Sequence, residues 1–194
     1  MSRLSRMMFF GFLFSFGAMA LVGSSRTTIA FFEDNNEIKA AVVKLSKKLD
    51  SKGVAELTKK YSLDELMQVF KLRTKGGLGV GEKAGAISPD GIEAKLQGLQ
   101  KKAPDKSDLA KNGKAYAAIG EISLVLAEIA DTHPDSPKEK KGEKDPKKWK
   151  EFVGKMKEGA KDLVTASNKG DSPGVKTAAK ILNDSCIECH GIFR

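Results

Sequence analysis

Cysteine, histidine and strand-forming patterns are scarce in this chain. Its 194 residues include two cysteines, two histidines and one tryptophan, and no segment alternates apolar and polar residues as a half-buried strand does. A structural zinc site takes four ligands, so it would need Cys186, Cys189 and His190 together with the distant His133 beside Pro134. A thioredoxin-like redox site would need a βαβ setting. The composition therefore argues against both.

What the chain does have is a pair of thiols followed at once by an imidazole, in Cys186-Ile187-Glu188-Cys189-His190. Cys-x-x-Cys-His is the attachment motif of a c-type haem. The thiols bind the two vinyl groups of the porphyrin as thioethers, and the imidazole ligates the iron on its proximal side. On a helix, Cys186 and His190 share one face. We therefore predict one covalent haem c on Cys186 and Cys189, with His190 as the metal ligand; the alternative is a helical protein in which the motif is accidental.

The first 30 residues have the pattern of a secretory signal peptide. Two arginines precede an uncharged, mostly apolar stretch over residues 7–22. Small residues at 28–30, or at 17–20, offer a cleavage position. We expect export to a periplasm and no stable membrane insertion after cleavage; an uncleaved segment that anchors the protein in the membrane is the alternative, although the apolar stretch is short for a span.

The remaining residues, 31–194, have the length of one domain. Removal of residues 1–30 lowers the formal net charge from +9 to +6, and the lysines that remain are densest over residues 138–150, with seven lysines against three acidic residues. This segment is either a solvated loop between helices or a surface for an acidic redox partner protein. No aromatic residues alternate with basic ones as in a nucleic-acid interface, so we expect no nucleic acid as a partner.

Apolar residues recur at helical spacing along most of the chain, which predicts an all-α fold. We expect an antiparallel four-helix bundle, with an extra short helix and a Gly-rich loop inserted after the first helix. Ser172 and Pro173 are the predicted N-cap and first turn of the last helix. The predicted helices cover residues 37–49 and 54–73 (one arm, broken near 51–62), about 90–99, 107–131, 147–168, and 173 to the end of the sequence.

Glycines within this pattern are open to two interpretations. The segment 76–81 is a flexible backbone that passes close to a bulky group, such as a haem edge, rather than a nucleotide loop, because it follows a helix and not a strand. Gly113 and Gly120 lie inside a predicted helix, where glycine is costly. Either tight helix packing or a flat ligand would account for them.

The ending Cys-Ile-Glu-Cys-His-Gly-Ile-Phe-Arg, on the last helix of a bundle, resembles the cytochrome c-prime family. The helix around Trp149 and the turn at Gly170 are similar to that family too, and the resemblance covers residues 107–194. It implies that Phe193 and Arg194 lie near the haem. It also implies that the first helix covers the distal side of the iron, and that a homodimer forms through the first two helices.

Met67 is the candidate distal ligand under this resemblance, because a thioether is a soft ligand that raises the haem potential. The alternative is that Met67 fills the core. Met156 is expected in the core, and His133 is disfavoured as a sixth ligand because it lies in a proline-containing connector. The predicted function is single-electron transfer. The alternative is a five-coordinate haem protein that binds nitric oxide or carbon monoxide. We do not predict an enzyme, because we identify no distal His–Arg pair in the sequence.

Overall fold

The computed structural model describes residues 25–194 of the chain, and within that range the regular secondary structure is entirely helical, as predicted. Residues 1–24 of the predicted signal peptide lie outside this range, and its last six residues belong to the first helix. None of the described helices is both long and apolar enough to cross a bilayer. The elements are α1 (Ser25–Lys47), α2 (Ser51–Lys60), α3 (Leu63–Met67), the 3₁₀ turns η1 (Gln68–Phe70) and η2 (Arg73–Lys75), α4 (Ile92–Lys101), α5 (Lys106–Thr132), α6 (Pro146–Lys169) and α7 (Ser172–Phe193).

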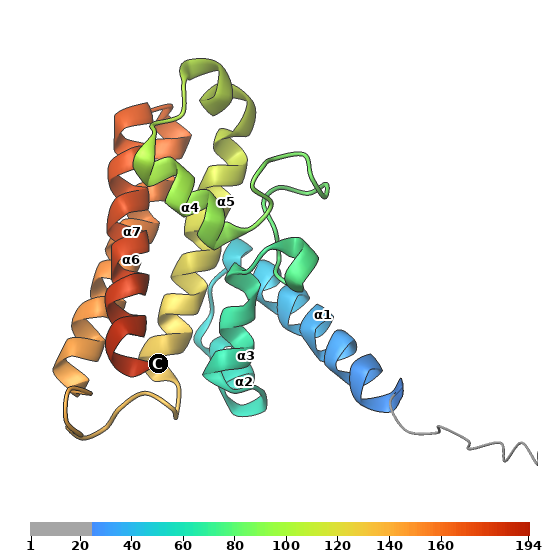
Figure 1. The fold of residues 1–194 in the computed structure, drawn as a ribbon, viewed down its shortest axis with the longest axis vertical. Coiled ribbons are helices and arrows are strands. Elements are labelled where there is room, and N and C mark those ends of the chain that lie inside the picture. Colours follow the sequence, from blue (N-terminus) through green and yellow to red (C-terminus); the bar gives the residue numbers. More distant parts are fainter. Residues whose placement is uncertain (1–24) are drawn as a thin grey trace, which may run out of the picture.

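Three long helices, α5, α6 and α7, run antiparallel and form most of the bundle (Figure 1). Gly120 and Gly159 allow these helices to approach closely. A Cβ atom at Gly120 would lie 2.6 Å from the carbonyl oxygen of Ala160, and one at Gly159 would lie 2.7 Å from the amide nitrogen of Leu182. Tight helix packing, and not a flat ligand, therefore explains the glycine in the middle of α5.

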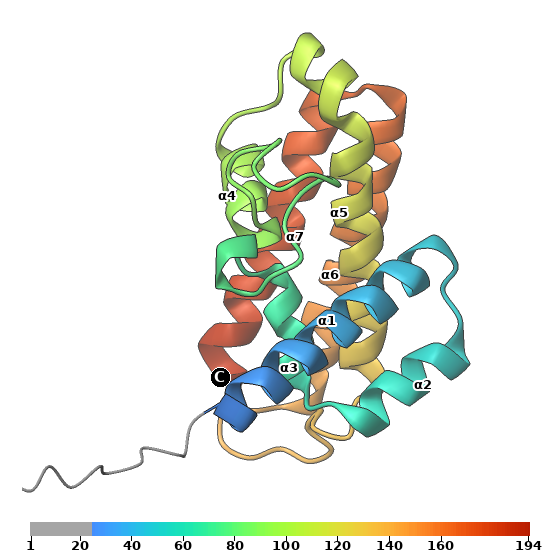
Figure 2. The ribbon, with the colours of Figure 1, turned by 90° about the vertical axis from the view of Figure 1, so that its right-hand side faces the viewer.

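The short helix α4 is the fourth member of the bundle, because it packs against α7. It has 10 residues, whereas α7 has 22, so α4 covers only part of α7. The predicted short helix is thus present after the first arm, and it packs against α7. The helix α1 crosses α5 obliquely on another side (Figure 2).

The first arm of the chain is broken near residues 51–62, as predicted, and its α-helical part ends at Met67 instead of continuing to residue 73. The helix α2 ends at Lys60, and α3 begins three residues later, at Leu63, because Ser62 and Glu65 form a capping box. The Ser62 hydroxyl accepts a hydrogen bond from the Glu65 amide, and the Glu65 carboxylate accepts one from the Ser62 amide. A capping box satisfies the free N–H groups at a helix start, so it makes this a new helix.

The last helix begins one residue earlier than predicted. Asp171, not Ser172, is its N-cap, because the Asp171 carboxylate accepts a hydrogen bond of 3.0 Å from the Gly174 amide. A carboxylate at this position also faces the positive end of the helix dipole. The Ser172 hydroxyl instead donates to the carbonyl of Pro104, which fixes the start of α7 to the segment before α5. The turn at Gly170 ends α6 in a left-handed conformation, as expected.

Candidate functional site

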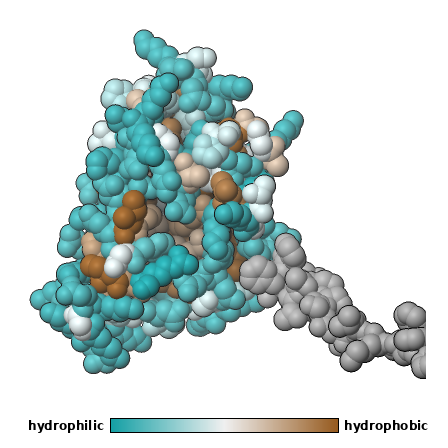
Figure 3. Space-filling view, in the orientation of Figure 1, coloured by the Kyte–Doolittle hydropathy of each residue, from teal (hydrophilic) through white to brown (hydrophobic). Residues whose placement is uncertain are grey.

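A cavity of about 420 Å³ opens beside the end of α7, between α3–η1, α6 and α7. Its volume lies within the range of small-molecule and cofactor sites. Apolar surface surrounds a hollow on this side of the molecule (Figure 3). The side chains that line it include Leu63, Met67, Phe70, Leu96, Trp149, Phe152, Val153, Met156, Asn183, Cys186, Cys189, His190, Phe193 and Arg194.

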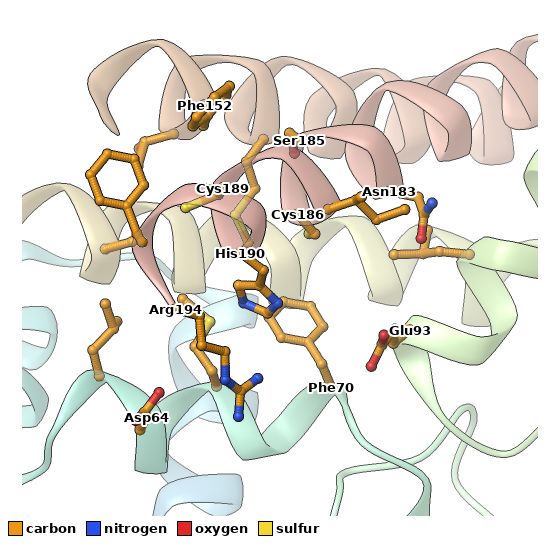
Figure 4. A pocket seen from close by; sticks show the side chains of 18 of the residues that line it. Asp64, Phe70, Glu93, Phe152, Asn183, Ser185, Cys186, Cys189, His190 and Arg194 are labelled. Carbon is orange, nitrogen blue, oxygen red and sulfur yellow. The ribbon is translucent and has the colours of Figure 1, made fainter. Parts of the chain in front are cut away.

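The helix α7 brings the predicted haem-binding residues to this cavity. Cys186, Cys189 and His190 all line it, as the helical spacing of the motif predicts (Figure 4). The two cysteines are half-buried and are not joined as a disulfide. His190 is solvent-exposed and also lines the cavity. One helical face therefore holds both thiols and the imidazole.

The thiols lie in surroundings that keep them protonated. Burial raises the pKa of the Cys186 thiol to about 12 and that of the Cys189 thiol to about 11. Redox-active Cys-x-x-Cys pairs need the thiolate and have a lowered pKa. These two thiols therefore differ from redox-active pairs. Among the described residues no cluster of His, Cys, Asp or Glu side chains forms a separate metal site.

The opposite wall of the cavity comes from α3 and η1. His190 and Arg194 project from α7 toward the segment that carries Asp64 and Phe70 (Figure 4). Met67 lies on the same segment, is half-buried, and lines the cavity. The predicted proximal residue and the predicted distal residue are thus brought to one cavity, from parts of the chain more than 100 residues apart.

Aromatic side chains close one end of the cavity. The rings of Trp149 and Phe193 meet edge to face, with centroids 5.0 Å apart and an angle of 86°. The Trp149 indole nitrogen donates a hydrogen bond of 3.0 Å to the carbonyl of Ala130, which fixes the ring on α5. Phe193 therefore packs against the core at the end of α7, whereas Arg194 stays exposed. Met156 is buried as expected and also faces the cavity.

His133 holds the segment that carries Met67 in place and does not line the cavity. Its Nε2 donates to the carbonyl oxygen of Tyr61 at 2.9 Å, and its Nδ1 accepts from the Asp135 amide at 3.0 Å. The Asp135 carboxylate in turn accepts a hydrogen bond of 3.3 Å from the amide of Leu63, which is the first residue of α3. The end of α5 is thereby tied to the start of the helix that carries Met67.

The Gly-rich segment 76–81 does not line the cavity, so the expectation that it passes a haem edge is wrong. Asp90 organises it instead. Its carboxylate accepts hydrogen bonds from the Arg73 guanidinium at 2.9 Å and from the amides of Val80 and Gly85 at 2.7 and 2.9 Å. Gly77 lies against the backbone of Lys71, and Gly79 lies against the Arg73 side chain.

The lysine-rich connector lies next to the end of α7. The Lys144 ammonium donates to the carbonyl oxygen of Phe193 at 3.2 Å. Lys148 pairs with Glu143 at 3.1 Å, and the Glu143 side chain is largely exposed. The positive charge of this connector is therefore placed close to the mouth of the cavity.

Sequence reasoning missed several polar or aromatic residues of the cavity, among them Phe70, Glu93 and Asn183. For Asn183 there was a signal. It stands three residues before Cys186 and seven before His190, so it shares their helix face, and a polar residue on that otherwise apolar face is unusual. Phe70 and Glu93 gave none, because only tertiary packing places them near α7.

Comparison with known proteins gives one family. The family model described as Cytochrome C′ matches residues 90–194, which include α4 to α7 and the Cys-x-x-Cys-His motif. No curated protein and no solved structure matches the chain. The segment that carries Met67 and Phe70 lies outside the matched range.

Proposed function

Because the chain belongs to the cytochrome c′ family, whose members are c-type haem proteins, we propose that it carries one haem c in the cavity beside α7 and transfers single electrons. One observation supports this most strongly. Cys186, Cys189 and His190 line the same apolar cavity as Met67. Its volume and its mostly apolar walls fit a flat, hydrophobic cofactor with a metal at its centre.

In this proposal each residue of the motif has a separate task. The sulfurs of Cys186 and Cys189 would each bond to one vinyl carbon, and each thiol hydrogen would pass to the neighbouring carbon of that vinyl group. His190 would bind the iron. The one-electron iron couple is the chemistry that haem supplies when bound. The protein provides apolar walls and axial ligands that set its potential.

Met67 would be the second protein ligand of the iron in this proposal. It is half-buried on α3 and shares a packed cluster with Trp149, Val153, Cys189 and Phe193. The His133–Tyr61 and Asp135–Leu63 hydrogen bonds hold this helix against the bundle. A positioned thioether favours the reduced iron and a low-spin state, which suits electron transfer.

We further propose export to the periplasm, because covalent haem attachment takes place outside the cytoplasm and the first 30 residues have the pattern of a signal peptide. A membrane anchor made by that segment is the alternative. The lysine-rich connector beside Phe193 suits an acidic redox partner protein. No catalytic residue is assigned.

An absorption spectrum of the purified, reduced protein tests the proposal. A low-spin spectrum that carbon monoxide leaves unchanged supports electron transfer with Met67 bound. A high-spin spectrum that shifts with carbon monoxide would contradict electron transfer and support a gas-binding function.

Haem staining of a denaturing gel tests the attachment itself. The double variant Cys186→Ala, Cys189→Ala should lose the stain completely. Ile187→Ala is the matched control, because Ile187 lies between the two cysteines and is 58 % exposed; it should keep the stain. A wild-type protein without stain would contradict the proposed function.

A further inference from the structure

Ile187 is an exposed apolar residue at the edge of the proposed haem site. Among the described residues, Leu49 and Ile187 are the large apolar side chains that are exposed, by 42 % and 58 %. Single exposed apolar side chains are common on soluble proteins, so their location decides whether they matter. Ile187 lines the cavity and stands between Cys186 and Cys189. In the haem-loaded protein it would therefore flank the porphyrin edge that the two sulfurs hold.

The surface beside Ile187 is open. Gly191 lies about one helical turn after Ile187 on the same face of α7, and it is exposed. A Cβ atom added at Gly191 would meet no atom within 4 Å outside its own stretch of helix. Another molecule can therefore approach α7 closely at this point, because no side chain of the protein stands in the way.

Ion pairs neutralise the charged surface around Ile187. They are Lys155–Glu151 at 2.9 Å, Lys155–Glu188 at 3.2 Å, and Lys180–Asp184. These two lysines and three carboxylates sum to one negative charge, whereas residues 31–194 together carry +6. The edge of the proposed haem site is thus nearly neutral on a strongly basic chain.

A nearly neutral, apolar face suits contact between two copies of this chain. Two copies with a net charge of +6 repel each other, and the repulsion is weakest where the local charge is near zero. When two copies meet about a two-fold axis, both contribute the same residues. Ile187 can then meet its counterpart, and Lys155 of one copy can face Glu188 of the other. The same face is therefore complementary to itself in both apolar contact and charge.

We propose that the face around Ile187 and Gly191 is the contact through which two copies of this protein exchange electrons. This rests on the proposed haem c. One electron passes from the reduced haem of one copy to the oxidised haem of the other, so the two copies swap oxidation states and no other reactant is needed. The contact is small and short-lived, as redox encounters are. It differs in charge from the lysine-rich connector, which suits an acidic partner.

The electron self-exchange rate of the haem-loaded protein tests this contact. NMR line widths in a half-reduced sample give this rate, and the driving force is zero for every variant, so a change of midpoint potential does not enter. Ile187→Asn should slow self-exchange roughly tenfold, because each encounter loses two apolar side chains. Leu49→Asn is the matched control. It replaces the other exposed apolar residue, which lines a different hollow between α1, α5 and α6, and it should exchange electrons at the wild-type rate.

A second pair of variants blocks the surface instead of changing its polarity. Gly191→Gln adds a side chain that has room on the folded protein and holds a second copy away, so it should slow self-exchange severalfold. Gly98→Gln on α4 is its control, because Gly98 is also exposed and an added Cβ there also meets no atom within 4 Å. If Ile187→Asn and Gly191→Gln both exchange electrons at the wild-type rate, the inference is wrong while the haem and its function stand.

Amide chemical shifts provide a readout that needs no electron transfer. As the fully reduced, haem-loaded protein is concentrated, the amide signals of residues 184–191 should shift, and those of residues 45–49 should not. Shifts confined to another face would also refute the inference. A protein without covalent haem on a stained gel would instead refute the proposed function.

Discussion

Residues 35–89 and residues 90–194 each build one wall of the same cavity, but they do so by different means. The second part matches the Cytochrome C′ family and carries both thiols and the imidazole on a single helix. The first part lies outside that match, yet it supplies Met67 and Phe70. One wall therefore depends on spacing within a helix, whereas the other depends on how a separate segment is held in place.

Two groups of contacts join these parts. His133 and Asp135, after α5, bind the backbone of Tyr61 and Leu63. Asp90, before α4, binds the Arg73 guanidinium and the amides of the Gly-rich loop. A short antiparallel bridge between Leu72 and Gly91 lies at the second junction. The cavity wall that carries Met67 is thus fixed at both ends. His133 and Asp135 hold the start of α3, and Asp90 holds η2.

The largest effect is expected from removal of the proposed distal ligand. Met67→Ala should change the haem spectrum from low-spin to high-spin and lower the midpoint potential by on the order of 0.1 V, because a thioether favours reduced iron. Absorption spectroscopy and a redox titration measure both. Met156→Ala is the control, since Met156 lines the same cavity from α6, and it should keep the low-spin spectrum. If Met67→Ala stays low-spin, the first part of the chain does not ligate the iron.

A smaller effect is expected when the junction at His133 is broken. His133→Leu leaves the buried Tyr61 carbonyl without its donor, and it should lower the free energy of unfolding by about 1–3 kcal/mol. Denaturant unfolding measures this. Thr132→Val is the control, because the Thr132 hydroxyl bonds only within its own helix. Equal free energies of unfolding for His133→Leu and Thr132→Val would mean that this junction does not hold the segment that carries Met67.

The junction at Asp90 should show a pH dependence. Burial acts to raise the pKa of the Asp90 carboxyl, but hydrogen bonds from Arg73 and the amides of Gly85 and Val80 outweigh it, so the pKa is below its ordinary value. A lowered pKa means that this stabilisation is present above about pH 4, the unfolded value, and is lost as the pH falls through the folded one. Asp90→Asn should cost about 1–2 kcal/mol at neutral pH. The difference from wild type should shrink in acid, and a difference independent of pH would exclude the carboxylate as the cause.

The smallest effect concerns the surface beside α7. Lys144→Glu should slow the oxidation of the reduced protein by ferricyanide a few-fold at low ionic strength, because it removes positive charge near the cavity mouth. At about 1 M salt the effect should vanish. Lys176→Glu, an exposed substitution near the start of α7, should change the rate much less. If both variants are oxidised by ferricyanide at the same rate, the net charge of the protein, and not the charge of the connector, determines that rate.

Local sequence signals were sufficient for one part of the molecule and insufficient for the other. The spacing of Cys186, Cys189 and His190 placed all three on one face because a helix repeats every 3.6 residues. The apolar stripe of α6 and the turn at Gly170 were likewise predicted, since they depend on nearby residues only. These features need no knowledge of the fold.

Other features depended on competition between local signals or on tertiary contacts. The apolar repeat predicted a helix up to residue 73, but α3 ends at Met67 and two 3₁₀ turns follow it. Asp171 displaced Ser172 as N-cap because a carboxylate is the stronger acceptor. The role of the Gly-rich segment was wrong because its partner, Asp90, could not be identified from spacing. Met67 could be named as a candidate, but its place in the cavity required the fold.

Mass spectrometry of the peptide that contains residues 186–190, taken from protein produced in a periplasm, tests the central claim most directly. The account predicts that this peptide carries the added mass of one haem, bound through both sulfurs. A peptide with two free thiols and no tetrapyrrole mass would contradict it.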